Sequence, residues 1–304
     1  MTDAVRASHP GPTRIGPATF CWGERTFVMG ILNVTPDSFS GDGLLEAAPG
    51  TTPRRGDPVE AAVAAGRRMV DEGADILDIG GESTRPGHAP VAADEERRRV
   101  VPIIAALRAA LPDVPLSIDT TKAAVAESAL AAGADLVNDV WGVGDDPALA
   151  RLAADHGVPF VVMHNRAEPR YTTFLPEVIA DLERAIERAL QLGVRWDDIV
   201  VDPGFGFGKT PEHNLILVRE LAALGMLGRP ILLGTSRKST LGRVLDLPVG
   251  ERLEATLATT ALGIAAGADV IRVHDVRANV RAARMSDAIV RATWHEAATE
   301  GGST

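Results

Sequence analysis

The chain has 304 residues and carries 31 Lys and Arg against 41 Asp and Glu, which gives a formal net charge of −10. This acidic balance excludes a protein that neutralises a nucleic acid backbone through a general basic surplus, so an anionic ligand would need basic residues placed locally. The single cysteine, Cys21, excludes intrachain disulfides and thiolate zinc sites, and no apolar run of about 18 residues predicts a membrane-spanning helix. We therefore expect a soluble cytoplasmic protein without a signal peptide.

Short apolar segments recur along the chain and predict buried strands. In chain order they lie at residues 27–34, 76–79, 115–118, 136–137, 159–162, 198–201, 230–233 and 270–271. The phrase Gly-Ala-Asp precedes three of them, at 73–75, 133–135 and 267–269, where the glycine is typical of the end of the preceding helix. The alternation of strands with helix-like stretches predicts an α/β fold with parallel strands. Eight units favour a single (β/α)8 TIM barrel of about 250 residues over an open doubly wound sheet.

The segments outside these units define the expected boundaries. Residues 1–18 are expected to form a disordered tail, 19–296 the barrel domain and 297–304 a flexible tail. A short N-terminal β-hairpin at 20–26 would close the bottom of the barrel. Residues 41–58, rich in Gly, Pro, Thr and Arg, predict a long loop after the first barrel strand.

Polar side chains follow every predicted strand. Because the active sites of such barrels lie at the carboxyl ends of the strands, these side chains are expected to converge on one face. In chain order they include Asn33, Glu82, Asp119, Asn138, His164, Asp202, Ser236 and Arg272. A single one of them would be explained as a helix cap, but eight on one rim indicate an enzyme.

The polar groups fall into two chemical classes. Residues 236–239, with Arg272 and His274, combine a helix start with cations and suit a phosphate or carboxylate. Opposite them, Asp119, Asn138 and Asp202 suit either a hard cation or the donor edge of a nitrogen heterocycle, and the residues alone leave both open. A flat ring could pack between Met163 and Phe207.

The glycine-rich segment 204–210 looks like a phosphate-binding loop but does not match one. Pro203 stands where the Walker A motif needs its first glycine, and Lys209 stands where a dinucleotide-binding loop needs its third. Neither motif is predicted.

Taken together, these segments resemble the dihydropteroate synthase family of pterin-binding TIM barrels. The resemblance extends over roughly residues 20–290, in the family's order, and is carried by the segments 29–40, 73–87, 117–120, 138–139, 163–166, 202–209, 236–239 and 272–275. It implies an enzyme in which p-aminobenzoate displaces pyrophosphate from 6-hydroxymethyl-7,8-dihydropterin diphosphate. The product is 7,8-dihydropteroate, a step in folate biosynthesis.

The resemblance also implies a role for each matching residue. The pterin would be bound by Asp119, Asn138, Met163, Asp202, Phe207 and Lys238. The diphosphate would be bound by Asn33, Arg272 and His274, and Asn33 would also ligate Mg²⁺, the implied cofactor. The p-aminobenzoate would contact Phe39, Thr84, Arg85 and Ser239. Catalytic roles would fall to Asp37, Asp119, Lys238 and Arg272.

Three further expectations follow from the resemblance. The family is usually a homodimer, so we expect a second copy as a partner besides the two small-molecule substrates. Where the family usually has Asp-Gly-Gly, this chain has Gly41-Asp42-Gly43 followed by an insert, which puts the contacts of that loop in doubt. No Phe-Gly insertion interrupts residues 82–87, so we expect sulfonamide sensitivity.

Other functions fit parts of the pattern. A pterin-binding methyltransferase barrel would share Asp119 and Asn138 but has no need of Arg272 and His274. A catalytically silent paralogue would bind ligand without turnover, and an unrelated phosphate-binding barrel would share only the fold.

Overall fold

The structure, a computed structural model, describes residues 9–34, 57–82, 91–142 and 147–294. Its main sheet consists of parallel strands in the order β8-β7-β6-β5-β4-β3-β10-β9. Their bounds are β3 Phe27–Asn33, β4 Ile76–Gly80, β5 Leu116–Asp119, β6 Leu136–Asp139, β7 Phe160–Met163, β8 Ile199–Asp202, β9 Leu232–Leu233 and β10 Val270–Val273. A parallel bridge between Val201 and Ile231 joins β8 to β9. The sheet thereby curls into a near-closed barrel, and the predicted (β/α)8 architecture is confirmed.

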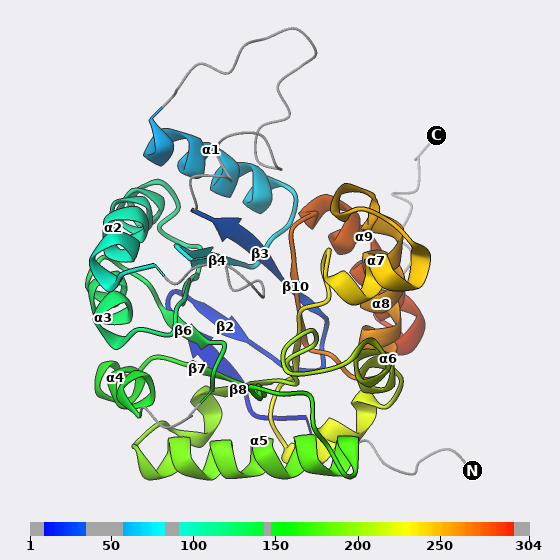
Figure 1. Cartoon of the computed structure of the whole chain (residues 1–304). Helices are drawn as coiled ribbons and strands as arrows, with labels where there is room; N and C mark the ends of the chain where they lie inside the picture. The colour runs from blue at the N-terminus through cyan, green and yellow to red at the C-terminus, as the bar shows by residue number, and fades with distance from the viewer. Residues whose placement is uncertain (1–8, 35–56, 83–90, 143–146, 295–304) are drawn as a thin grey trace, which may run out of the picture.

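Helices surround the barrel, as Figure 1 shows. Within the described residues they are α1 Pro58–Asp71, α2 Ala93–Ala110, α3 Ala123–Ala131, α4 Ala148–His156, α5 Phe174–Gln191, α6 Pro211–Arg219, α7 Ser239–Leu245, α8 Leu253–Ala265 and α9 Val276–Val290. Short 3₁₀ helices lie at Trp196–Asp198, Leu221–Leu227 and Val249–Glu251. The repeat is regular except after β9, which is followed by both α7 and α8. No helix in these described ranges is long and apolar enough to cross a membrane.

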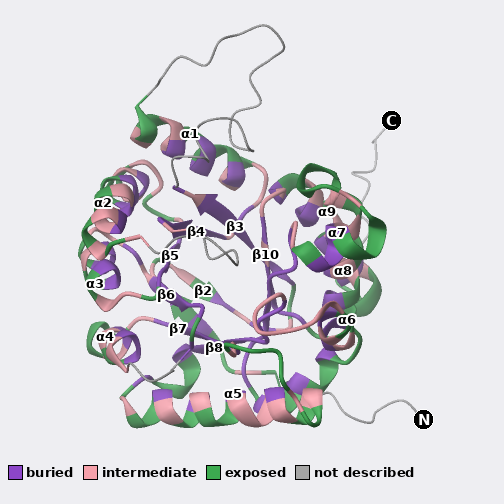
Figure 2. Ribbon diagram, viewed as in Figure 1, coloured by how far each residue is buried: buried purple, intermediate pink, exposed green. Residues whose placement is uncertain are grey.

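The alternation of side chains along each strand creates two cores. On β10, Ile271 and Val273 point outward into the layer between strands and helices, whereas Val270 points into the barrel. Figure 2 shows this pattern as buried strands enclosed by helices whose outer faces are exposed. The inner core fills the half of the barrel at the amino ends of the strands. The interior at their carboxyl ends is left to polar side chains.

A two-stranded antiparallel hairpin closes the bottom of the barrel, but it lies earlier in the chain than we expected. Its strands are β1 (Thr13–Ile15) and β2 (Ala18–Phe20), instead of a hairpin at 20–26, so part of the expected N-terminal tail is ordered structure. The reason is packing: Phe20 lies 4.7 Å from Phe27 between ring centroids, and Trp22 donates a 2.9 Å hydrogen bond to Thr13. Residues 1–8 and 295–304 lie outside the described residues.

The repeated Gly-Ala-Asp phrase has one structural role at all three positions. Each aspartate lies just before a barrel strand. It exchanges two hydrogen bonds with one residue at the neighbouring strand. The backbone N–H of Asp75, Asp135 and Asp269 donates to the carbonyls of Val28, Leu116 and Ile231. The aspartate carboxylates accept in return from the N–H groups of the same three residues, at 2.8, 2.9 and 3.0 Å. The repeat is therefore a device for aligning strands at the amino end of the barrel.

Candidate active site

The carboxyl ends of four neighbouring strands place their polar residues in one row. Strand pairing aligns Asn33 with Gly80, Gly80 with Asp119, and Asp119 with Asn138. Gly80 has no side chain to separate its neighbours: a Cβ there would lie 3.8 Å from Asn33 Oδ1 and 3.7 Å from Asp119 Oδ2. Parallel pairing thus brings together residues that were predicted to act on one ligand.

An ionic cluster lies below this row inside the barrel. Arg272 donates to Asp78 Oδ2 through Nε at 2.6 Å and to Asp119 Oδ2 through Nη2 at 2.5 Å. Asn138 donates to the same oxygen of Asp78 at 3.2 Å. We expect from the sequence that Arg272 lies opposite the acceptor group, but the structure pairs it directly with Asp119. The reason is that β10 is separated from β5 only by β3 and β4 in the curved sheet.

Asp78 belongs to this cluster and was missed by the sequence analysis. It is fully buried in the middle of β4. The available signal was a carboxylate inside an apolar strand, at the position that alternates with Leu77 and Ile79 and therefore faces the barrel interior. We had instead attended only to the ends of the strands.

Several buried oxygens of the cluster have no hydrogen-bond partner among the described residues. They are Asp78 Oδ1, Ser117 Oγ and Asp119 Oδ1. Leaving a buried acceptor without a donor is costly, so such atoms commonly mark a place where water or a ligand supplies the donor. These oxygens lie on the neighbouring strands β4 and β5 and could accept from one ligand with several N–H groups.

The electrostatics of Asp119 follow from its burial. Burial raises the pKa of its carboxyl to about 7, and Arg272 opposes that shift while Asp78 adds to it. Burial alone would lower the pKa of Arg272, but the charges of Asp78 and Asp119 outweigh it and raise the value. The arginine therefore remains charged at physiological pH, whereas Asp119 is poised between its two protonation states.

Lys238 and Asp202 form the second part of the site. Burial raises the pKa of Asp202. The charge of Lys238 and a 2.7 Å hydrogen bond from the backbone N–H of Gly204 lower it in part. Burial lowers the pKa of Lys238 to about 8, with Asp202 acting in the opposite direction. The Lys238 amine donates to the carbonyl of Phe205 and lies 4.5 Å from the ring centroid of Phe207.

The predicted anion corner is smaller than the motif suggested. Arg237, in a left-handed conformation with φ 57°, turns to form a two-point ion pair with Asp275 at 2.6 and 3.1 Å. It is therefore engaged away from the other residues of the corner. Ser236 accepts from the backbone N–H of His274 at 3.2 Å, and its oxygen lies 3.0 Å from His274 Nδ1. We assign the hydroxyl proton of Ser236 to the bond with Nδ1, which places the imidazole proton of His274 on Nε2.

The structure places some of the other predicted site residues and not the rest. Met163 is buried at the end of β7, and Ser239 is exposed at the first position of α7. Asp37, Phe39, Thr84 and Arg85 lie outside the described residues, so the structure does not place them. The functional role of each residue stays a prediction.

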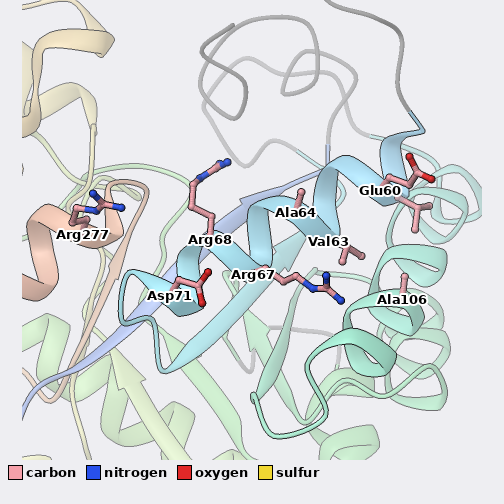
Figure 3. A pocket seen from close by; sticks show the side chains of 9 residues that line it. Glu60, Val63, Ala64, Arg67, Arg68, Asp71, Ala106 and Arg277 are labelled. Atoms are coloured by element: carbon pink, nitrogen blue, oxygen red, sulfur yellow. The ribbon is translucent and has the colours of Figure 1, made fainter. Parts of the chain in front are cut away.

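A separate hollow lies on the outer surface of the barrel (Figure 3). It has a volume of about 650 Å³ and is lined mainly by α1, with Ala106 of α2 and Arg277 of α9. Its charged lining consists of three arginines, Arg67, Arg68 and Arg277, and two carboxylates, Glu60 and Asp71. This outer hollow includes none of the predicted site residues.

Comparisons with known proteins agree with this geometry. The profile of the family described as "Pterin binding enzyme" matches residues 29–274, from β3 to just beyond β10. The dihydropteroate synthase of Clostridium beijerinckii is 50% identical over 279 residues, which cover 91% of this chain and 99% of the relative. A crystal structure of the Clostridium difficile dihydropteroate synthase in the presence of pteroic acid superposes with a TM-score of 0.82 at 49% identity, covering 90% of this chain and 99% of that one. The inactive dihydropteroate synthase 2 of Mycobacterium tuberculosis is 42% identical, covering 86% of this chain and 82% of the relative.

Proposed function

The chain belongs to the family of pterin-binding enzymes, and from that premise we propose that it is a dihydropteroate synthase. It joins p-aminobenzoate to 6-hydroxymethyl-7,8-dihydropterin diphosphate, giving 7,8-dihydropteroate and pyrophosphate. The observation that carries the proposal is the grouping of buried acceptors and cations at the carboxyl end of the barrel. Asp119, whose Oδ1 has no partner among the described residues, and Asp202 both lie close enough to Lys238 to affect its pKa. A pterin has the complementary pattern, with amino and ring N–H donors next to a carbonyl acceptor.

The residues of this end of the barrel divide the binding of the pterin among them. Asp119, Asn138 and Asp202 accept from its N–H donors, and Lys238 donates to its carbonyl and ring nitrogen. Met163 and Phe207 flank the ring. The proximity of the Lys238 amine to the Phe207 ring supports this arrangement, because both then border the same space.

The chemical step exchanges one bond for another at the methylene carbon of the pterin. The C–O bond to the diphosphate breaks, and pyrophosphate leaves with the electron pair. Arg272 and the Nε2–H of His274 hold the departing negative charge, which is where fixed donors lower the barrier most. The carbon that remains is electron-deficient and is stabilised by the pterin ring and the nearby carboxylates. The p-aminobenzoate nitrogen then forms the C–N bond and loses a proton to solvent.

We assign Mg²⁺ to the diphosphate, with Asn33 as its protein ligand. The described residues contain no group of three His, Cys, Asp or Glu suited to a metal. Mg²⁺ is commonly held by one or two protein oxygens together with substrate phosphates and water. Asn33 Oδ1, at the end of β3 beside Gly80, offers an oxygen donor of this kind. When bound, the ion would neutralise charge on the leaving group.

The second substrate is assigned to the mouth of the barrel. Ser239, at the start of α7, would receive the carboxylate of p-aminobenzoate. Phe39, Thr84 and Arg85 would shape its pocket, and Asp37 would assist the reaction from the same loop as Phe39. These assignments rest on the family motifs of this chain.

We further propose that the enzyme is a cytoplasmic homodimer. The outer faces of α8 and α9 support a second copy as the partner, because Leu262, Met285 and Ile289 are 61%, 62% and 69% exposed. Apolar side chains gathered on adjacent helices are typical of an interface. The lone cysteine supports a reducing compartment.

A catalytically silent paralogue is the second candidate, since one relative at 42% identity is an inactive protein. The test is Mg²⁺-dependent release of pyrophosphate from the pterin diphosphate, measured with and without p-aminobenzoate. Release that requires p-aminobenzoate, and that is abolished by Lys238→Ala or Arg272→Ala, is expected. Binding of the pterin diphosphate without release would overturn the synthase and establish the silent paralogue.

A further inference from the structure

Lys209 belongs to the glycine-rich segment 204–210, which looks like a phosphate-binding loop, and it directs its amine into the protein. The amine donates to His164 Nδ1 at 2.7 Å, to the carbonyl of Phe207 at 3.0 Å and to the carbonyl of His164 at 3.4 Å. A lysine has three N–H donors, so these acceptors satisfy it completely. No N–H of Lys209 remains for a phosphate. The glycines of this segment therefore have a role other than phosphate binding.

Those glycines allow the segment to lie directly against the chain that follows β7. Gly204 and Gly208 have φ values of 69° and 53°, in the left-handed region. A Cβ on Gly204 would lie 1.8 Å from the carbonyl oxygen of His164, and one on Gly208 would lie 2.3 Å from that of Arg166. Tyr171 adds a 2.8 Å hydrogen bond from its hydroxyl to the carbonyl of Gly208. The two backbones therefore touch at two points, with Lys209 bridging them.

His164 is itself held in one orientation. Its Nε2 lies 3.1 Å from Asp181 Oδ2 on α5, and Arg166 donates to the same oxygen at 2.8 Å. Because the lysine amine can only donate when charged, Nδ1 accepts and Nε2–H donates to Asp181. Burial lowers the pKa of His164 to about 4 and that of Lys209 to about 7, so the charged lysine and the neutral imidazole coexist between these two values. The imidazole is thus neutral at physiological pH, as the hydrogen bonds require.

The residues on either side of this link are Met163 and Phe207, which are predicted to flank the pterin ring. We call the space between them the pterin slot. Met163 directly precedes His164, and Phe207 supplies one of the carbonyls that Lys209 binds. The walls come from different strands: Met163 ends β7, and Phe207 follows β8. Backbone hydrogen bonds join β7 to β8 along their length, and the last of them runs from His164 N to Asp202 O at 2.8 Å. Among the described residues Phe207 lies beyond that point, where the side chain of Lys209 makes the connection.

We propose that Lys209 is a positioning residue that sets the spacing between Met163 and Phe207 for the pterin ring. It does so by tying the backbone at Phe207 to His164. The inference rests on the proposed function, because it takes the pterin as the ring that enters the slot. Lys209 touches no substrate in this scheme, and its effect is confined to one of the two substrates.

The test compares Lys209→Met with Tyr171→Phe. Lys209→Met keeps the apolar stem and removes all three hydrogen bonds, whereas Tyr171→Phe removes one hydrogen bond from the same segment and leaves the link between Phe207 and His164 intact. The dissociation constant of the pterin diphosphate is measured by calorimetry without p-aminobenzoate, and KM is measured for each substrate. Lys209→Met is expected to raise the dissociation constant and KM for the pterin about tenfold, with KM for p-aminobenzoate within about twofold, and Tyr171→Phe to leave all three within about twofold.

Unchanged pterin binding in a folded Lys209→Met variant would overturn the proposal, and so would an equal rise in both KM values. If Lys209→Met does not fold, Lys209→Gln keeps two N–H donors on a shorter stem and is expected to give a smaller loss of pterin affinity. A wild-type protein that binds the pterin diphosphate without turnover would disprove the synthase activity but not the role of Lys209. The binding comparison would still decide the role of Lys209.

Discussion

Arg272 of β10 and Asp78 of β4 form a 2.6 Å ion pair inside the barrel, although 194 positions separate them in the chain. The same guanidinium holds Asp119, and the same carboxylate oxygen of Asp78 accepts from Asn138. Asp78 therefore orients an arginine assigned to the diphosphate and an asparagine assigned to the pterin. It connects the two halves of the site without being predicted to touch either substrate.

Replacing Asp78 should impair both halves. Asp78→Asn removes the charge that fixes Arg272, so we expect kcat/KM to fall at least about tenfold and the unfolding free energy to fall by about 3 kcal/mol, as for a buried pair that loses one partner. Pyrophosphate release and urea denaturation measure the two effects. Asp198→Asn is the matched control, because it removes a buried carboxylate that pairs with Arg195 at 2.6 and 2.9 Å. Asp198 directly precedes β8 at the amino end of the barrel, so kcat/KM should stay unchanged. Equal activity of Asp78→Asn and wild type would contradict the orienting role.

Ser236 should act through the tautomer of His274. In Ser236→Ala, Nδ1 loses the hydroxyl that holds it, so the imidazole samples both tautomers and kcat is expected to fall about three- to tenfold. The ¹⁵N chemical shifts of the ring nitrogens report the tautomer directly. Thr235→Val serves as the control because the Thr235 hydroxyl bonds to Thr259 instead. A wild-type spectrum with the proton on Nδ1 would show that the assignment is wrong.

The buried imidazole of His164 predicts a pH dependence of stability. Its pKa falls from 6.5 to about 4 on folding, because burial and Lys209 disfavour the charged form. Between these values the unfolded chain binds the additional proton, so stability falls as the pH decreases from 6.5 to about 4. Denaturation of wild type and His164→Gln across this range isolates the effect, since glutamine does not titrate. The stability of wild type relative to the variant should decrease with acid, and a constant difference would refute the prediction.

The aligning aspartates at the amino end of the barrel should contribute to stability and not to catalysis. Asp135→Ala removes the acceptor for Leu116 N–H and the ion-pair partner of Arg108. We expect the unfolding free energy to fall by about 1–3 kcal/mol, with kcat/KM unchanged. Asp113→Ala, at an exposed position between α2 and β5, should change neither quantity. A loss of kcat/KM in a folded Asp135→Ala protein would show that the two ends of the barrel are coupled.

Removal of Mg²⁺ tests the assignment of Asn33. Chelation with EDTA is expected to abolish pyrophosphate release, and added Mg²⁺ to restore it. Asn33→Ala should raise the Mg²⁺ concentration for half-maximal activity about three- to tenfold, because one of few protein ligands is lost. Activity that persists without divalent cations would eliminate the metal from the reaction.

The fold could be predicted from the sequence because its signals are local. Each barrel strand was recognisable from a short apolar segment, three of them preceded by Gly-Ala-Asp and three beginning with Pro, and the structure confirms all eight. The hairpin was misplaced because no comparable pattern marks β1 and β2. Their position depends on Phe20 and Trp22 packing against Phe27, which is a contact between segments and not a property of either one.

The candidate site could be predicted only in part. Strand ends and motifs were sufficient to select residues such as Asp119, Asn138 and Lys238. Asp78 escaped notice because it lies in the middle of its strand, and Lys209 because its segment resembled a motif that it does not match. Neither role can be read from neighbouring residues along the chain.

The sequence by itself therefore determined the order of the strands along the chain, the α/β class with parallel strands and the chemistry gathered at one end, since periodicity and turn residues act over a few positions. Only the tertiary structure decided which charges pair: Arg272 with Asp78 and Asp119, Arg237 with Asp275, and the Lys209 amine with His164. The physical reason is that closing the barrel brings β10 within hydrogen-bonding distance of β4 and β5, across 194 and 153 positions of the chain. At such separations the choice among several possible partners depends on strand register and burial, which are properties of the folded barrel.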